Sequence, residues 1–396
     1  MPWRESDVLD LRTRFIFDQQ RGLYTMAELC RSYAISRETG YKWVERYEQG
    51  GLLALPDRSR APLNHPNQMG ARVVQQLLEL RRAHPRWGPK KLRGYLAEKQ
   101  PRTGWPAHST IGELLRREGL ASARRTWRKV PPYTQPFSAV KEPNQVWCVD
   151  FKGWFRTGDG ERIDPLTMTD AHSRYLLRCQ AVEKSNTAQV AGVLEAAFRE
   201  YGMPLAMLSD NGAPFASRAI AGISRLQLYL MKLGIRPERI AAGHPEQNGR
   251  HERMHRRLKA ETAQPPAAHR RAQQRAFDRF REEYNQERPH EALGQHPPGQ
   301  CYRESPRAYP ARLPQPEYPG GMEVRRVQKH GEFRWGGEAV FISEALAGEA
   351  IGLEAMEEGY WQIYFARFPL GRFNSVKGRV EPLGKNDKNR KLGRAG

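Results

Sequence analysis

A single acid inside an otherwise apolar run constrains the fold of this chain more than any other feature. The run is Val146-Trp-Cys-Val-Asp-Phe151, and its alternation puts Val146, Cys148 and Asp150 on one face of a strand and Trp147, Val149 and Phe151 on the other. A strand that is apolar on both faces is typical of the centre of an α/β sheet covered by helices. An ionised Asp150 at that position would cost several kcal/mol without compensation. A divalent cation and a buried Arg or Lys would each provide it, and the run alone favours neither.

A second acid follows another short buried segment. Asp210 lies in Leu208-Ser-Asp-Asn-Gly-Ala-Pro-Phe215, directly after the extended segment 204–209. Ligand sites in α/β sheets favour the carboxyl ends of strands, which makes Asp210 a candidate ligand. An Asp before Asn-Gly also commonly caps the turn, and that simpler role stays open.

A third acid, Glu252, lies in a segment that is otherwise rich in cations. The segment runs His244-Pro-Glu-Gln-Asn-Gly-Arg-His-Glu-Arg-Met-His-Arg-Arg-Leu-Lys259, and we expect a helix over 248–261. His255, Arg256 and Lys259 share the helix face of Glu252, so a surface Glu–Arg pair is one explanation. The opposite face carries Arg250, Arg253 and Arg257 with no acid, which favours a metal ligand beside a path for phosphates.

These three acids predict a metal site if they meet in space. Carboxylate oxygens select Mg²⁺ or Mn²⁺ over softer metals. Two such ions roughly 4 Å apart activate an attacking oxygen and stabilise a leaving one at phosphorus. The expected cofactor is therefore Mg²⁺ or Mn²⁺, with two ions.

The net charge of +21 and the pI of about 10.0 indicate a polyanionic partner, with nucleic acid as the obvious choice. Residues 71–130 carry fifteen Lys/Arg against four Glu, a net of +11, whereas residues 1–60 carry ten against nine. An anionic membrane is the competing partner, but we find no apolar run of about eighteen residues and no signal peptide. The four cysteines are widely scattered, which favours reduced, buried thiols in a cytoplasm.

The amino-terminal part predicts two all-α helix-turn-helix domains, at 1–56 and 71–120, separated by a linker at 57–70. Thr25 with Glu28, and Ser36, are expected helix caps in the first, and Ser109 is an expected cap in the second. The alternatives are an ordinary helical hairpin, since Gly40 is a poor helix-interior residue, and a solvated basic face. The expected DNA-binding cations, which all lie in these domains or the linker after them, are Arg37, Lys42, Arg46, Lys90, Lys91, Arg116, Arg117, Arg124, Arg125 and Arg128.

A basic, Pro-rich linker at 121–143 precedes an α/β pattern at 144–305. The strands expected there cover 145–155, 164–170, 173–181, 204–209 and 234–241, and the helices cover 187–201, 217–233, 248–261 and 269–284. Short alternating runs at 320–384 predict a small β-barrel or sandwich, and 385–396 reads as a basic tail.

The order of these motifs resembles the integrase catalytic core of bacterial insertion-sequence transposases, relatives of retroviral integrases. The resemblance rests on Asp150 in a strand, Asp210 in Ser-Asp-Asn-Gly, and Glu252 in Gln-Asn-Gly-Arg-His-Glu. Tyr284-Asn-Gln-Glu-Arg-Pro-His-Glu-Ala-Leu293, with Pro297, Pro298 and Tyr302 beyond it, resembles the segment that closes this core.

The resemblance implies an RNase H-like fold with a five-stranded mixed sheet, and an acidic catalytic and metal-binding triad of Asp150, Asp210 and Glu252. It also implies DNA contacts at Arg256 and Lys259, and substrate orientation by Asn211, His244 and Asn248. Two departures are visible. Forty-one residues separate Asp210 from Glu252, which we attribute to an insertion around Ala219–Met231. Helix-turn-helix domains stand in place of a His/Cys zinc domain.

The function expected from the resemblance is that of a DDE transposase, which nicks the ends of an insertion sequence and joins the 3′-hydroxyl to target DNA. The alternatives are a catalytically silent DNA-binding regulator and a nuclease of the same fold. The expected partners are double-stranded DNA, as terminal inverted repeats and as target, and further copies of the chain in a synaptic complex. We expect a bacterial cytoplasmic protein that is associated with the nucleoid when it is bound to DNA. We do not expect a membrane as a partner.

Overall fold

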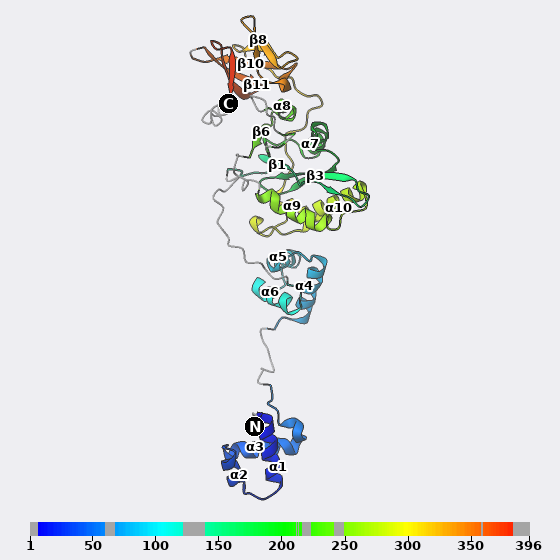
Figure 1. The fold of residues 1–396 in the computed structure, drawn as a ribbon, viewed down its shortest axis with the longest axis vertical. Helices are drawn as coiled ribbons and strands as arrows, with labels where there is room; N and C mark the ends of the chain where they lie inside the picture. The colour runs from blue at the N-terminus through cyan, green and yellow to red at the C-terminus, as the bar shows by residue number, and fades with distance from the viewer. Residues whose placement is uncertain are drawn as a thin grey trace, which may run out of the picture. The chain divides into compact units, whose positions relative to one another are not determined.

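The computed structural model describes residues 7–59, 68–121, 139–210, 212, 214–215, 223–240, 249–357 and 359–382, with the backbone alone at 250. The chain divides into two compact units, Met1–Gly70 and Ala71–Gly396. The second unit holds a three-helix segment, an α/β core and a carboxyl-terminal β region. Figure 1 shows these elements in the colours of their order along the chain.

The first unit is all-α. It contains α1 (Val8–Gln20), α2 (Met26–Ser32), α3 (Arg37–Gly50) and a 3-10 turn over Gly51–Ala54. Both caps expected here are confirmed: Thr25 and Glu28 form a reciprocal capping box, and the Ser36 hydroxyl accepts from the Thr39 amide. The two helices of the predicted helix-turn-helix therefore begin where their polar caps place them.

Gly40 has a packing role that its low helix propensity conceals. A Cβ atom at this position would lie 2.5 Å from Cys30 Sγ and 3.1 Å from the Phe15 ring. The core of the unit thus requires α3 to approach α2 too closely for any side chain. Gly40, which counted against a helix-turn-helix because of its low helix propensity, is therefore required for α2 and α3 to pack.

The three-helix segment of the second unit contains α4 (Ala71–Ala83), α5 (Pro89–Lys99) and α6 (His108–Arg117). Pro89 occupies the first turn of α5 and Gly119 has a φ of +68° beyond α6, as expected. The cap predicted at Ser109 is wrong, because α6 begins at His108, two residues before the expected first residue, and Ala107 occupies the cap position without a side-chain bond. The helix is positioned by burial of Ile111, and His108 and Ser109 are exposed, so water can satisfy the first amides.

The core contains one mixed sheet, with the strand order β2-β3-β1-β5-β6 and β4 paired to β3. The strands are β1 (Val146–Phe151), β2 (Phe155–Arg156), β3 (Arg162–Asp170), β4 (Leu176–Val182), β5 (Ala206–Ser209) and β6 (Arg236–Arg239). β1 pairs with β3 in antiparallel fashion and with β5 in parallel. The predicted RNase H-like core with a five-stranded mixed sheet is confirmed, with the short strand β2 added on β3.

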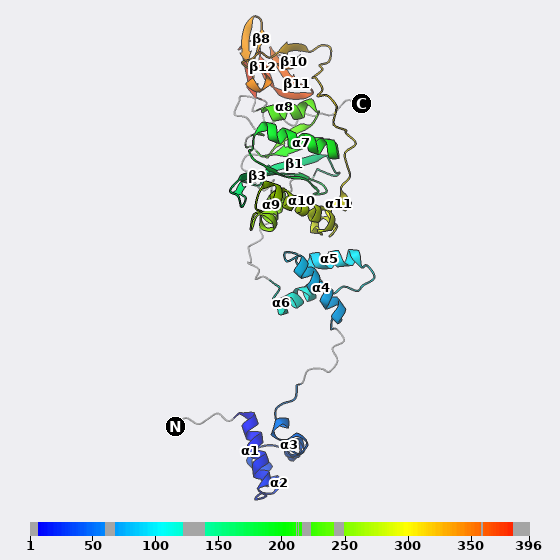
Figure 2. The same cartoon turned by 90° about the vertical axis from the view of Figure 1, so that its right-hand side faces the viewer.

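Helices cover both faces of this sheet, with α7 and α8 on one face and α9 and α10 on the other (Figures 1 and 2). They are α7 (Thr187–Tyr201), α8 (Arg225–Lys232), α9 (Gly249–Thr262) and α10 (Arg270–Glu282), followed by a π-helical turn (Glu283–Glu287), a 3-10 turn (Glu291–Leu293) and α11 (Pro298–Cys301). Trp147 and Val149 pack in the cluster that includes α7 and α8, whereas Val146 and Cys148 pack in a different one. The alternation predicted for β1 is therefore confirmed.

Helix α8 is shared by two hydrophobic cores. Leu226 and Leu230 pack in the α/β core, while Leu228 and Met231 pack against the carboxyl-terminal β region. The insertion predicted around Ala219–Met231 therefore overlaps, from Arg225 onward, a helix that both cores need. Residues 219–222 lie outside the described part.

The carboxyl-terminal region contains a five-stranded antiparallel sheet, in the order β13-β12-β11-β10-β7, and a β8-β9 hairpin. The strands are β7 (Glu323–Arg326), β8 (Glu332–Trp335), β9 (Glu338–Phe341), β10 (Ala350–Ala355), β11 (Tyr360–Phe365), β12 (Phe368–Asn374) and β13 (Arg379–Pro382), with a 3-10 turn at Glu344–Leu346. A barrel is not confirmed, because β7 and β13 are the two ends of the pairing order among the described residues. The basic tail at 385–396 lies outside them.

Three of the four cysteines, Cys30, Cys148 and Cys179, are buried and Cys301 is half-buried. Among the helices that the structure describes, none combines the length and the apolar character needed to cross a bilayer.

Replacing Gly40 by Ala should destabilise the first unit by about 1–3 kcal/mol, because the new methyl group overpacks the contact with Cys30. Hydrogen exchange of the α3 amides should then become faster. Gly112→Ala in α6 is the matched control: its Cβ would lie 3.5 Å from Pro89 Cγ, an ordinary contact. We expect that control to stabilise its helix by roughly 0.5–1 kcal/mol. Unchanged α3 exchange in Gly40→Ala would contradict the packing role.

Candidate active site

Asp150 and Asp210 lie at the carboxyl ends of two neighbouring parallel strands, β1 and β5. Val149 of β1 is in register with Ser209 of β5, and each is followed directly by one of the two acids. Neighbouring strands are about 4.8 Å apart, so the backbones that carry these carboxyl groups are adjacent. Both residues are half-buried.

Glu252 lies across the same cleft from Asp150. It is exposed on the first turn of α9 and lines, together with Asp150, a cleft of about 570 Å³. The other residues along this cleft are Phe151, Lys152, His255, Arg256, Lys259, Ala260 and Gln264. The first and third acids of the predicted triad thus share one cavity, and the second follows the strand next to the first.

Asp210 also performs the simpler turn role that the sequence left open. Its Oδ1 accepts a hydrogen bond of 3.2 Å from the Gly212 amide. A Cβ atom at Gly212 would lie 3.1 Å from Asp210 Oδ2, so the carboxylate folds closely over the turn. This leaves Oδ2 outside that bond, and the turn role does not exclude a ligand role.

Two buried histidines of α9, His251 and His255, hold this helix on the sheet. Both Nε2 atoms lie 2.6 Å from the hydroxyl of Thr167 on β3, and that hydroxyl donates to the Asp150 carbonyl at 3.1 Å. If the hydroxyl gives its one hydrogen to that carbonyl, it accepts from both imidazoles, and each ring then carries its proton on Nε2. Thr169 Oγ1 lies 3.3 Å from His251 Nδ1.

Burial keeps both rings neutral. It lowers the pKa of His251 to about 3 and, together with the nearby His251 and Lys152, the pKa of His255 to about 2. With the proton on Nε2, the lone pair of each ring is on Nδ1. A neutral imidazole with a fixed tautomer is the form that binds metal ions.

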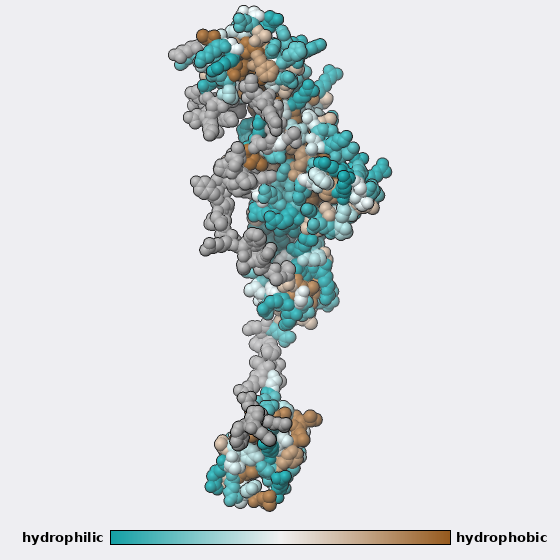
Figure 3. Space-filling view, in the orientation of Figure 1, coloured by the Kyte–Doolittle hydropathy of each residue, from teal (hydrophilic) through white to brown (hydrophobic). Residues whose placement is uncertain are grey.

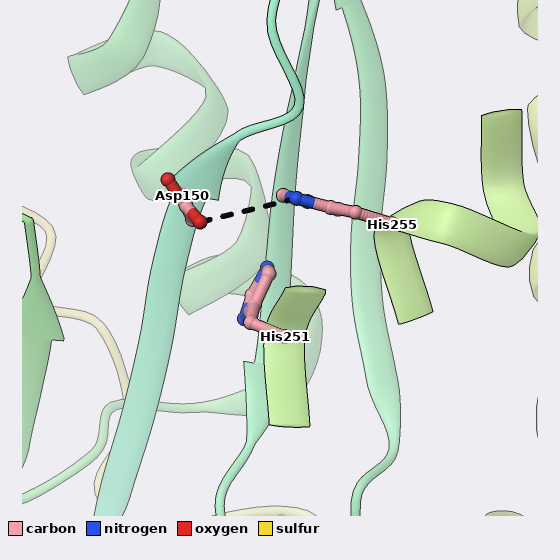
Figure 4. Close-up of side chains that lie close together, drawn as sticks. All are labelled: Asp150, His251 and His255. Atoms are coloured by element: carbon pink, nitrogen blue, oxygen red, sulfur yellow. Dashed lines mark ion pairs between the residues drawn. The ribbon is translucent and has the colours of Figure 1, made fainter. Parts of the chain in front are cut away.

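The donor atoms at this edge fit a divalent cation. His255 Nδ1 lies 3.9 Å from Asp150 Oδ2, and one donor atom from each of Asp150, His251 and His255 falls within 4.8 Å of the others (Figure 4). The carboxylates favour Mg²⁺ or Mn²⁺, while imidazole nitrogen suits zinc, copper, iron or nickel ions. From the sequence, His255 was considered only as a neighbour of Glu252. The i, i+4 spacing of His251 and His255 was the signal that could have identified them as a pair on one helix face.

Cations line the same cleft as the acids. Lys152, Arg256 and Lys259 are among its lining residues, and Arg256 and Lys259 are exposed on α9. The surface over this helix is hydrophilic in the space-filling view (Figure 3). A negatively charged backbone in the cleft would therefore find cations next to the carboxylates, on both the strand and the helix.

The predicted DNA-binding cations lie in different settings. Arg37 and Lys42 are exposed on α3, and the Arg46 guanidinium lies 4.9 Å from the centre of the Trp43 ring. Arg116 and Arg117 lie beside Glu113 and Glu118 on and after α6. Arg124, Arg125 and Arg128, and also Asn211, His244 and Asn248, lie outside the described residues.

Lys90 and Lys91 contact the α/β core. Lys90 pairs with Glu291 at 2.6 Å, and Lys91 donates to the Pro289 carbonyl. Burial, together with the positive charges of Arg288 and Arg257, lowers the pKa of Lys91 to about 7. In this arrangement the amine of Lys91 is only partly protonated at neutral pH.

Family comparisons agree with this architecture. Residues 140–245 and 233–298 each match an integrase core domain, residues 12–62 match a helix-turn-helix domain, and residues 39–115 match a homeodomain-like domain. Residues 140–298 therefore resemble an integrase core domain, and the matches before them are to helix-turn-helix and homeodomain-like domains.

The relatives are proteins of bacterial insertion elements. An uncharacterized 31.7 kDa protein of insertion element IS407 from Burkholderia multivorans is 28% identical over 235 residues, 58% of this chain and 79% of the relative. The transposase InsD of insertion element IS2 from Escherichia coli is 28% identical, over 56% of this chain and 74% of the relative. The predicted resemblance to insertion-sequence transposases is confirmed.

Among solved structures, the HTLV-2 integrase catalytic core domain in complex with magnesium aligns with 41% of this chain and 97% of its own, at 16% identity and a TM-score of 0.30. The integrase assembly of simian T-cell lymphotropic virus, an intasome in complex with a PP2A regulatory subunit, aligns with 72% of this chain and 91% of its own, at 17% identity and a TM-score of 0.37.

Thr167→Val should destabilise the core, because two buried imidazole N–H groups lose their acceptor. Each loss costs about 1–3 kcal/mol, so the urea midpoint of the full chain should fall clearly. Thr167→Ser keeps the hydroxyl and should unfold near the wild-type midpoint. Thr169→Val removes only a contact of 3.3 Å and should have a smaller effect. A Thr167→Val midpoint equal to that of the wild type would refute this role.

Proposed function

We propose that this protein is a DDE transposase, which cleaves DNA at the ends of an insertion sequence and joins the freed 3′-hydroxyl to target DNA. The observation that supports the proposal is the placement of the acids in the α/β core. Asp150 and Asp210 follow parallel neighbouring residues, and Glu252 lines the cleft of Asp150. The integrase core and helix-turn-helix matches support it.

Asp150, Asp210 and Glu252 would hold the divalent metal, with Mg²⁺ or Mn²⁺ as the expected ion and two ions as the expected number. When bound, the metal makes an attacking oxygen more nucleophilic and stabilises the charge of a leaving oxygen at phosphorus. The carboxylates supply the oxygen donors, and the neutral His255 ring presents a nitrogen beside Asp150.

The remaining residues of the cleft bind and position the DNA. Lys152, Arg256 and Lys259 would pair with phosphates on either side of the reacting one, which orients the strand without reading its sequence. His251 and His255 keep α9 against β3, so that Glu252 stays across from Asp150. Asn211, His244 and Asn248 remain candidates for orienting the substrate.

Recognition of the element ends would come from the helix-turn-helix domains. Arg37, Lys42 and Arg46 lie along α3, the second helix of the α2–α3 helix-turn-helix, and the second helix is the one that enters the major groove in such motifs. Joining one DNA to another requires two bound ends, so we expect a homo-oligomeric synaptic complex. Its substrate would be bacterial chromosomal DNA, which places the expected action in the cytoplasm at the nucleoid.

Asp210→Asn should abolish cleavage and joining while leaving binding to the element ends nearly unchanged, because it removes a metal-binding charge and alters no residue of the helix-turn-helix domains. The assay is strand transfer, with labelled DNA from the flanks of the reading frame, a plasmid target, and Mg²⁺, Mn²⁺ or EDTA. Glu195→Gln is the control, since this half-buried acid of α7 pairs with Arg199 and lies on the other face of the sheet (Figure 1).

The outcomes separate the possible functions. Metal-dependent joined products from wild type and control, and none from Asp210→Asn, would support the transposase. Cleavage without joining would indicate a nuclease, and specific binding without cleavage would indicate a regulator. An Asp210→Asn protein that still joins DNA would overturn the triad.

A further inference from the structure

A second cavity adjoins the cleft that holds Asp150 and Glu252. Its volume is about 240 Å³, and Lys152 and Lys259 line both cavities. The other residues that line it are Gly153, Trp154, Phe155, Pro165, Leu258, Thr262, Ala263 and Phe277. The two lysines therefore stand between the acids and this second cavity.

The second cavity is aromatic and apolar beyond its lysines. Leu258 and Phe277 are fully buried in the core between α9, α10 and the sheet, and they form its apolar lining. Trp154, in contrast, is 55% exposed although it is the largest apolar side chain of the site. Single exposed apolar side chains are common on protein surfaces, so the exposure of Trp154 matters here because its ring also lines a cavity.

The backbone fixes Trp154 in this place. The Lys152 amide donates to the Pro165 carbonyl at 2.9 Å, and Gly153 has a φ of +86°, which a side chain would disfavour. The Arg162 guanidinium lies 4.7 Å from the centre of the Trp154 ring. The ring is thus held between β1 and β2 by a tight turn and a cation, although half of its surface remains in solvent.

Size and charge together define the ligand. Pockets for drug-sized ligands measure about 300–1,000 Å³, so about 240 Å³ suits a single flat ring system better than a larger molecule. Aromatic side chains next to lysines are the usual means of binding unpaired nucleic acid, in which bases stack and phosphates pair with cations. A base within a duplex is already stacked and paired, and so cannot enter.

We propose that this cavity, the Trp154 pocket, binds one unpaired nucleobase of the DNA strand whose phosphate lies in the acidic cleft. The inference rests on the proposed function for the identity of the ligand as DNA. The lysines shared by the two cavities would pair with the backbone that connects the stacked base to the reacting phosphate. The pocket would thereby favour frayed DNA ends over fully paired ones.

The test uses the full-length protein and a forked duplex that carries two unpaired nucleotides at one 3′ end, one of them 2-aminopurine. Stacking on an aromatic ring quenches this fluorophore. No divalent metal is added, so that the probe stays intact. We expect quenching on binding, and a fork affinity roughly 5- to 100-fold weaker in Trp154→Ala, the usual range for loss of one stacked base. The affinity for the fully paired duplex should stay unchanged.

Two variants make the test specific. Trp154→Phe keeps an aromatic face and should retain most of the fork preference. Leu205→Ala truncates another exposed apolar side chain, 52% exposed just before β5 at the edge away from Asp210, and should behave as wild type. Equal quenching in wild type and Trp154→Ala would overturn the proposal. So would a Trp154→Ala protein that loses self-association in sedimentation but keeps its fork affinity, because the ring would then contact another protein copy.

Failure of the pocket and failure of the proposed function give different results. Metal-dependent cleavage by the wild type without Trp154-dependent quenching would remove the pocket and leave the transposase. Trp154-dependent quenching by a protein that never cleaves DNA would support the pocket and reject the transposase. A protein that binds neither the forked nor the paired duplex would overturn both.

Discussion

The parallel pairing of β1 with β5 is the constraint on which the candidate active site depends. These two strands lie side by side at the centre of the sheet, and their register is fixed by apolar residues buried on both faces. A shift of one residue would turn every side chain of β5 to the other face, so burial makes such a slip costly. The positions of Asp150 and Asp210 are consequently set by hydrophobic packing, and the charged groups themselves contribute little to holding them there.

The third acid is positioned by a different kind of interaction. Helix α9 has a markedly polar sequence, and its contact with the sheet combines Met254 and Leu258 with the two histidines that bond Thr167. A buried hydroxyl with two imidazole donors has a defined geometry, which an apolar contact of the same area would lack. The position of α9 along β3 is therefore set by directional hydrogen bonds as well as by apolar burial. Because Glu252 follows His251 directly, the same bonds fix the position of its backbone.

Much of this architecture could be predicted from the sequence, because local rules determine it. The polar caps at Thr25 and Ser36 and the alternation along β1 depend on neighbours within a few residues, and the structure agrees with them. Within the region 320–384, strand β12 contains Pro369 and Gly371, which interrupt the alternation typical of a strand, and its place is defined by its partners β11 and β13.

The parts of the site that the sequence could not supply depend on residues distant in the chain. The contact between His251 and Thr167 spans 84 positions, and nothing near either residue indicates it. The cavity beside Trp154 likewise combines the turn after β1 with residues of α9 and α10. The roles of the three acids remain predictions that assays must test, although the sequence identified the acids themselves by their order and neighbours.

Helix α8 has a consequence for how the molecule divides. Its two apolar sides belong to two different cores, and Lys232 at its end pairs with Glu349 of the carboxyl-terminal region at 2.6 Å. A cut between the α/β core and the carboxyl-terminal sheet would therefore leave Leu228 and Met231 in water. The two regions share one helix as part of both hydrophobic cores. Neither region can therefore be exchanged for a foreign module unless that helix is rebuilt.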